Sequence, residues 1–265
     1  MTRMEYAQNV AELVNGEAKV IEKANGVKLT GIIAGENAVR PTIYIDYLYD
    51  EGAPVEATAE YVRRIVENNN TPDMNLAFLQ DFDNVKDKLR LRLYNEQTKA
   101  DIYEYAEGFN DLIVIPYLEN IMQSENGIGS AKVTDSLLKT WGVSRTEVMK
   151  IAKENSGPEE YEIKTMAEIM SEMMGGILPP IPGGELMNVI TSKNKICGAY
   201  GVIALKEQLK EMYPDGYVVL PSSIHEVIVI QKGIGELVAM AEMVQEVNRT
   251  QVRPEEVLGH KAYEF

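Results

Sequence analysis

The N-terminal part of the chain alternates short apolar patterns with turn-forming residues. Apolar side chains at helical spacing predict a helix over residues 4–14, with Thr2 as its N-cap. The pair Asn25-Gly26 separates two apolar-rich runs and tolerates the positive φ angles of a tight turn, so it predicts a two-residue β-hairpin. A strand over residues 42–45 and a helix over residues 54–68 follow. We therefore expect a small β-meander with a helix at each end.

Basic residues alternate with leucines in the middle of the chain. A basic residue occupies every second position from Lys86 to Arg92, and the interleaved leucines are Leu89, Leu91 and Leu93. This period of two predicts a strand over residues 88–94 that buries its leucines and exposes its basic side chains to solvent. A second strand is predicted over residues 111–118, where Pro116 favours an edge or a bulge because proline has no N–H to donate.

The C-terminal part alternates predicted strands with predicted helices. Ser144 and Glu147 have the spacing of a capping box, which predicts the start of a helix. Beyond it, the pattern predicts helices over residues 199–212 and 235–248 and strands over residues 186–191, 217–220 and 224–230.

Together these elements predict an α+β fold with antiparallel or mixed sheets flanked by helices. We divide it into an N-terminal lobe of helix, β-meander and helix over residues 1–85, and a larger C-terminal α+β lobe over residues 86–265. One continuous domain is the alternative.

Composition narrows the class of protein. The chain has 265 residues with 26 basic and 41 acidic side chains, so its net charge is −15 and we expect no direct nucleic-acid contact. No apolar run approaches the roughly 20 residues that cross a bilayer, and the N-terminus lacks the apolar segment of a secretory signal. Cys197 is the only cysteine, which excludes an intrachain disulfide and fits a reducing compartment. We expect a cytoplasmic protein with no membrane segment.

Several stretches carry a resemblance to known sequences. They are Asp215–Ile230, which contains Pro221-Ser222-Ser223-Ile224-His225, then Trp141–Ser144, and Val252–Leu258. With these stretches the chain resembles an uncharacterised family of intestinal Clostridia, whose members often lie near mobile genetic elements. Residues 85–265 are more loosely similar in layout to a second uncharacterised, bacillar family. Neither resemblance implies an activity or a set of catalytic residues.

The candidates for catalysis surround His225. Ser222, Ser223 and His225 are the residue types of a hydrolase site, in which a histidine activates a serine. The serines lack the Gly-x-Ser-x-Gly elbow, however, so a structural histidine with a serine closing the turn is the interpretation we favour. Cys197 near a helix start is either a thiolate or a packing residue, and we favour packing. No cofactor or metal motif is complete, so we expect neither.

These observations favour a non-enzymatic cytosolic protein that binds a protein partner, as an adaptor or as an accessory of a mobile element. Two alternatives stay open. One is an acidic mimic of DNA that inhibits a DNA-binding enzyme, which requires carboxylates arrayed along one face. The other is a hydrolase that uses His225. The sequence leaves the oligomeric state open.

Overall fold

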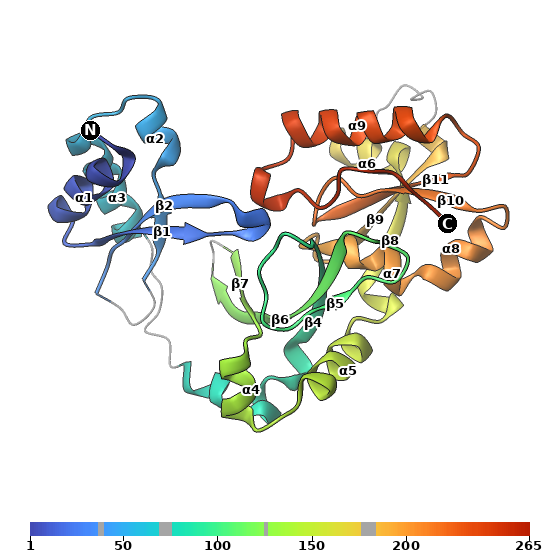
Figure 1. Cartoon of the computed structure of the whole chain (residues 1–265), viewed down its shortest axis with the longest axis horizontal. Coiled ribbons are helices and arrows are strands. Elements are labelled where there is room, and N and C mark those ends of the chain that lie inside the picture. Colours follow the sequence, from blue (N-terminus) through green and yellow to red (C-terminus); the bar gives the residue numbers. More distant parts are fainter. Residues whose placement is uncertain (37–39, 69–75, 125–126, 176–183) are drawn as a thin grey trace. The chain divides into compact units, whose positions relative to one another are not determined.

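A computed structural model describes residues 1–36, 40–68, 76–124, 127–175 and 184–265 (Figure 1). Internal contacts divide the chain into two compact units, Met1–Phe78 and Leu79–Phe265. Both units combine helices with antiparallel sheets, so the fold is α+β, as predicted. Independent folding of two domains, with the boundary at residue 85, stays a prediction.

The N-terminal unit packs helices against a three-stranded antiparallel sheet of order β1-β2-β3. Its elements are α1 (Arg3–Leu13), β1 (Glu17–Glu22), β2 (Lys28–Ile33), β3 (Thr42–Tyr44), α2 (Asp46–Asp50) and α3 (Val55–Asn68). Thr2 caps α1 as predicted, and the structure adds a complete capping box with Glu5. The hairpin is confirmed, and Asn25 and Gly26 take φ angles of 59° and 67°. Its turn is longer than predicted, because the three residues Ala24–Gly26 form a short 3-10 helix.

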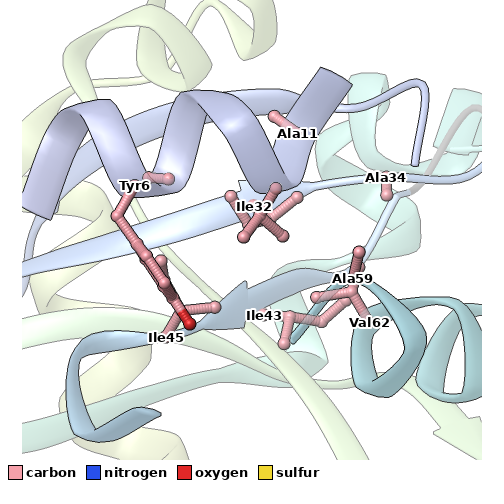
Figure 2. Packing of buried hydrophobic residues seen from close by; sticks show 10 residues of the cluster. Tyr6, Ala11, Ile32, Ala34, Ile43, Ile45, Ala59 and Val62 are labelled. Carbon is pink, nitrogen blue, oxygen red and sulfur yellow. The ribbon is translucent and has the colours of Figure 1, made fainter. Parts of the chain in front are cut away.

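Apolar side chains from α1, α3 and the sheet close the core of this unit (Figure 2). Ile32 in β2 lies at its centre, is fully buried and is paired with Ile43 in β3. Val10 of α1 and Val62 of α3 are also fully buried. Burial of this apolar surface is the main force that holds the two helices on the sheet.

The larger unit begins with a sheet in which β6 is the central strand. The elements are β4 (Leu89–Asn95), β5 (Glu104–Tyr105), β6 (Leu112–Ser124) and β7 (Gly127–Lys132). Pro116 lies within β6, which is paired on both sides, so of the two predicted alternatives the edge position is wrong. A register irregularity does occur in β6, two residues further on, between Leu118 and Met122. The Pro116 carbonyl accepts from Val133 N–H, and β5 pairs with residues 113–114 while β7 pairs from residue 117. The missing N–H of Pro116 therefore faces the gap between β5 and β7, where no ladder bond is lost.

The alternating pattern on β4 is half confirmed. Leu89, Leu91 and Leu93 are buried, as predicted. The opposite face is not the solvated surface that we expected, because Arg92 is only 6% exposed. The strand also starts later than predicted, since Lys86 and Lys88 belong to a preceding 3-10 turn. A tertiary partner for Arg92, described below, replaces solvent on this face.

The rest of the larger unit contains a five-stranded antiparallel sheet of order β12-β10-β11-β9-β8. The strands are β8 (Tyr161–Thr165), β9 (Met187–Ser192), β10 (Tyr217–Leu220), β11 (Glu226–Gln231) and β12 (Tyr263–Glu264). The helices of this unit are α4 (Asp135–Trp141), α5 (Arg145–Asn155), α6 (Met166–Met173), α7 (Gly201–Ala204), α8 (Lys206–Met212) and α9 (Leu237–Thr250). Ser144 caps α5 as predicted, by accepting from Glu147 N–H at 3.1 Å. The helix predicted over residues 199–212 is broken at Leu205 into α7 and α8.

Candidate functional sites

A polar cavity of about 210 Å³ opens in the larger unit. Two basic and two acidic side chains line it: Arg90, Lys193, Glu119 and Glu160. Further polar lining comes from Asn120, Ser192, Asn194 and Cys197. The cavity thus joins β4, β6, the start of β8 and the turn after β9, which are distant in sequence. Such convergence of polar groups on a concave surface is typical of a ligand site.

The acidic wall of the cavity lies where β6 becomes irregular. Glu119 lies in the interval between Leu118 and Met122 over which the register with β7 shifts. The next residue, Asn120, takes a left-handed φ of 53°. Bulges of this kind are frequent beside functional sites, because they end the regular ladder and expose its polar groups.

Arg92 and Glu119 form a buried ion pair behind this wall. Arg92 Nε donates to Glu119 Oε1 at 2.9 Å, and the two side chains are 8% and 14% exposed. The Arg92 guanidinium also lies 4.4 Å from the centre of the Tyr117 ring. The Tyr117 ring stacks in turn on the Tyr94 ring. Arg92 therefore faces its carboxylate and an aromatic surface, and Glu119 is the member of the pair that lines the cavity.

Cys197 is a buried residue of the cavity lining and carries a neutral thiol. It is 8% exposed, and burial raises the pKa of the thiol, while the positive charge of Arg92 opposes that rise. A raised pKa disfavours the thiolate, which agrees with the packing role that we favoured. The next residue, Gly198, has no room for a side chain, because a Cβ there would lie 2.1 Å from the backbone N of Ser192.

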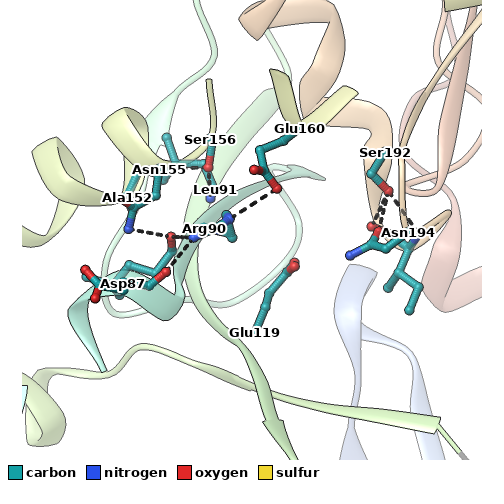
Figure 3. Close-up of polar contacts among 12 residues, drawn as sticks. Asp87, Arg90, Leu91, Glu119, Ala152, Asn155, Ser156, Glu160, Ser192 and Asn194 are labelled. Carbon is teal, nitrogen blue, oxygen red and sulfur yellow. Dashed lines mark hydrogen bonds and ion pairs between the residues drawn. The ribbon is translucent and has the colours of Figure 1, made fainter. Parts of the chain in front are cut away.

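Arg90, one of the two basic residues of the lining, is anchored to backbone carbonyls at the start of β4 and in the turn before it (Figure 3). Arg90 Nη1 donates to the carbonyls of Asp87 and Leu89 at 2.8 and 2.9 Å, and its Nε lies 3.8 Å from Glu160 Oε2. On the opposite side, Ser192 Oγ donates to Asn194 Oδ1 at 2.7 Å, which holds the turn that carries Lys193. The guanidinium is therefore fixed before any ligand arrives, whereas Lys193 is exposed.

The structure places His225 outside the polar cavity lining, in the bend before β11. Its Nδ1 accepts from Cys197 N–H at 3.3 Å, so the ring proton sits on Nε2, which lies 3.6 Å from Glu256 Oε1. The His225 carbonyl also accepts from Gly198 N–H at 2.9 Å. The ring and the backbone carbonyl of His225 together stabilise the Cys197–Gly198 turn, so His225 has a structural role. Catalysis by His225 stays a prediction.

The two candidate serines flank that bend. Ser223 Oγ accepts from His225 backbone N–H at 3.1 Å and so closes the turn. Ser222 contributes its backbone, since its carbonyl accepts from Leu258 N–H at 3.1 Å. Both serines are partly exposed. The described contacts bring Ser223 to the backbone of His225 rather than to its ring.

An apolar groove of about 230 Å³ lies beside α9 in the larger unit. Its floor includes Met187 and Ile230, which are paired across β9 and β11. The remaining lining residues are Leu186, Ile234, Gly235, Glu236, Ala239, Met240 and Met243. Leu186 and Met243 are 50% and 51% exposed, so large apolar side chains stand open to solvent here. Exposed apolar patches on a folded protein commonly mark binding surfaces.

Sequence reasoning named Cys197 but not the polar cavity that it lines, and it missed the apolar groove. The polar cavity depends on Glu119, which lies one residue beyond the strand that we predicted. An acidic residue at the end of a strand that pairs with an Arg-rich strand was the available signal. The groove depends on Met187, Met240 and Met243, which are spread over a strand and a helix. Met243 of α9 is half exposed and was not among the residues that the sequence singled out.

The fold and these surfaces define an α+β protein of two compact units whose larger unit carries a polar cavity and an apolar groove. By sequence, residues 3–265 match a family of unknown function, DUF5688, and the chain belongs to that family. No curated protein and no solved structure matches it. Over the described ranges, none of the helices has the length and apolar character to cross a membrane. The same residues contain no group of three or more His, Cys, Asp or Glu side chains suited to a metal ion.

Proposed function

We propose that this protein is a non-enzymatic binding protein that takes an amphipathic, basic segment of a partner protein into the apolar groove beside α9. The observation that carries the proposal is the groove itself, whose lining is apolar and whose rim is open to solvent. An apolar surface of this kind gains free energy when a partner removes it from water.

The groove suits an adaptable contact. Met187, Met240 and Met243 supply flexible, polarisable side chains that repack around partners of different shape. Met240 is buried in the cluster with Val218 and Val244, so the fold holds the floor, while Met243 is 51% exposed at the rim. The preorganised floor reduces the conformational entropy that binding costs, whereas ordering Met243 adds to that cost.

Charge selects the partner class. Among the described lining residues Glu236 carries the only charge, and it is exposed. The whole chain has a net charge of −15. A segment that places apolar side chains at helical spacing and Lys or Arg beside them would meet apolar lining and acidic surroundings at once. The cytoplasmic location and the role as an accessory of a mobile element belong to this proposal, and they rest on the lone cysteine and the resemblance.

The surface chemistry favours this proposal over the DNA mimic. A mimic needs uncompensated carboxylates along one face, whereas many carboxylates here face a basic side chain. Examples are the pairs Arg3–Asp50, Lys86–Asp83, Arg145–Asp135, Lys164–Glu172, Lys206–Glu107 and Lys232–Glu264. These pairs mix the two signs of charge over the surface and weaken a phosphate-like array.

The test is peptide binding measured by fluorescence anisotropy. The probe is a fluorescein-labelled peptide of leucines and lysines at helical spacing, and its control carries serine in place of leucine. We expect the first peptide to bind the wild-type chain with a Kd below about 100 μM and the control to bind at least about tenfold more weakly. Met243→Glu places a charge in the groove and is expected to weaken binding at least about tenfold.

Val238→Glu is the matched control, because Val238 is on the same helix, is 70% exposed and does not line the groove. It should leave the Kd unchanged. If both variants weakened peptide binding equally, or if Met243→Glu did not weaken it, the peptide would not bind in the groove. Its binding would then be explained by charge attraction alone. A dimer that Met243→Glu dissociates, without any peptide binding, would assign the groove to a second copy and overturn the proposal.

A further inference from the structure

We propose that the polar cavity is a binding site for a small zwitterion of amino-acid size, which carries one ammonium and one carboxylate group. This site is separate from the apolar groove, with which it shares no lining residue. Its volume of about 210 Å³ lies below the roughly 300–1,000 Å³ of pockets for drug-sized ligands. The cavity therefore suits a small metabolite.

The charges of the lining select both ends of such a ligand. Arg90 and Lys193 supply donors for a carboxylate, and Glu119 and Glu160 supply acceptors for an ammonium group. Because the lining carries both signs of charge, a ligand with one ammonium and one carboxylate group is complementary to it, whereas a ligand with a single charged group is complementary to one sign only.

The cavity is also organised in advance. Arg90 is held by two backbone carbonyls, and Glu119 is held by Arg92. A buried pair such as Arg92–Glu119 adds little net stability compared with apolar packing, because removing its charges from water is costly. We therefore assign the pair a role other than stability. Fixing a carboxylate at the wall of a polar cavity is such a role, since fixed groups lose less entropy when a ligand binds.

The experiment screens the twenty standard amino acids by thermal shift, followed by calorimetry on each that raises the Tm. For each hit, the amide lacks the carboxylate charge and the deaminated acid lacks the ammonium group. We expect at least one amino acid to bind and both of its analogues to bind about tenfold or more weakly, as for the loss of one charge-assisted hydrogen bond. Binding of the deaminated acid as tight as that of the amino acid would overturn the zwitterion, and so would the absence of any hit.

Variants locate the site. Lys193→Glu changes an exposed side chain at the carboxylate end and should weaken binding about tenfold or more. Glu119→Gln removes the charge at the ammonium end and keeps an acceptor for Arg92, with the same expected loss. Lys195→Glu makes the same charge change in the same turn, outside the lining, and should leave the Kd unchanged.

A hit that Lys193→Glu and Glu119→Gln do not weaken would overturn this cavity as its site. Anisotropy of the leucine–lysine peptide on the same preparations keeps the two proposals apart, since its outcome depends on Met243 and not on Lys193.

Discussion

In the N-terminal unit Ile32 is enclosed by apolar side chains, whereas in the larger unit Arg92 is enclosed by Glu119, Tyr117 and Tyr94. Both residues lie on strands, and both are nearly inaccessible to water. The apolar core is stable because any well-fitting apolar neighbour lowers its free energy. The polar cluster is stable only while each charge keeps its partner. The stability of the N-terminal unit thus depends on apolar volume and shape, and the stability of the larger unit depends in part on keeping specific charge pairs intact.

The largest effect is expected from breaking the buried pair. Glu119→Ala leaves Arg92 charged and without its partner, so the free energy of unfolding should fall by about 3–5 kcal/mol. Trp141 is the only tryptophan and lies in the larger unit, so its fluorescence reports the transition of that unit during urea unfolding. Replacing both partners, in Arg92→Met with Glu119→Leu, should restore most of this stability because no charge is left buried. A double variant as unstable as Glu119→Ala would show that the cost arises from packing rather than from charge.

A smaller effect is expected in the apolar core. Ile32→Ala removes a fully buried side chain and leaves a cavity, which should lower the free energy of unfolding by about 3 kcal/mol. Far-UV circular dichroism follows both units, whereas Trp141 follows only the larger one. The loss should therefore appear in the dichroism curve and leave the fluorescence curve in place. An equal shift of both curves would show that the two units unfold as one.

The smallest effect is expected at the cap of α1. The backbone N–H of Thr2 donates to Glu5 Oε2 at 2.8 Å and holds the pKa of Glu5 below its ordinary value of 4.5. A depressed pKa in the folded state contributes stability that is present above pH 4.5 and is lost as the pH falls through the folded pKa. Glu5→Gln keeps the capping geometry without the charge. In unfolding monitored by dichroism, the wild type should be slightly more stable than the variant at neutral pH and equally stable in acid. A difference in the free energy of unfolding that increases in acid would contradict this prediction.

Local signals predicted much of the fold. The cap at Thr2, the Asn25-Gly26 turn and the cap at Ser144 each depend on residues a few positions apart, and the structure contains all three. Alternation on β4 placed the leucines in the core for the same reason. These features follow from backbone geometry over one or two turns of chain, which the sequence displays directly.

The sites could not be predicted in this way. From the sequence alone, Arg92 is predicted to be exposed. In the structure β4 pairs with β6, and this pairing brings Glu119, 27 positions away, to the Arg92 side chain. From the sequence alone, His225 is a candidate for catalysis because of its residue type. In the structure its ring accepts a hydrogen bond from the N–H of Cys197, 28 positions earlier. The sequence by itself determined the helix caps at Thr2 and Ser144, the Asn25-Gly26 turn and the buried leucines of β4, and it showed that the chain is acidic. Tertiary structure alone decided which polar groups meet, because the energy of a buried charge depends on a partner that local spacing does not specify.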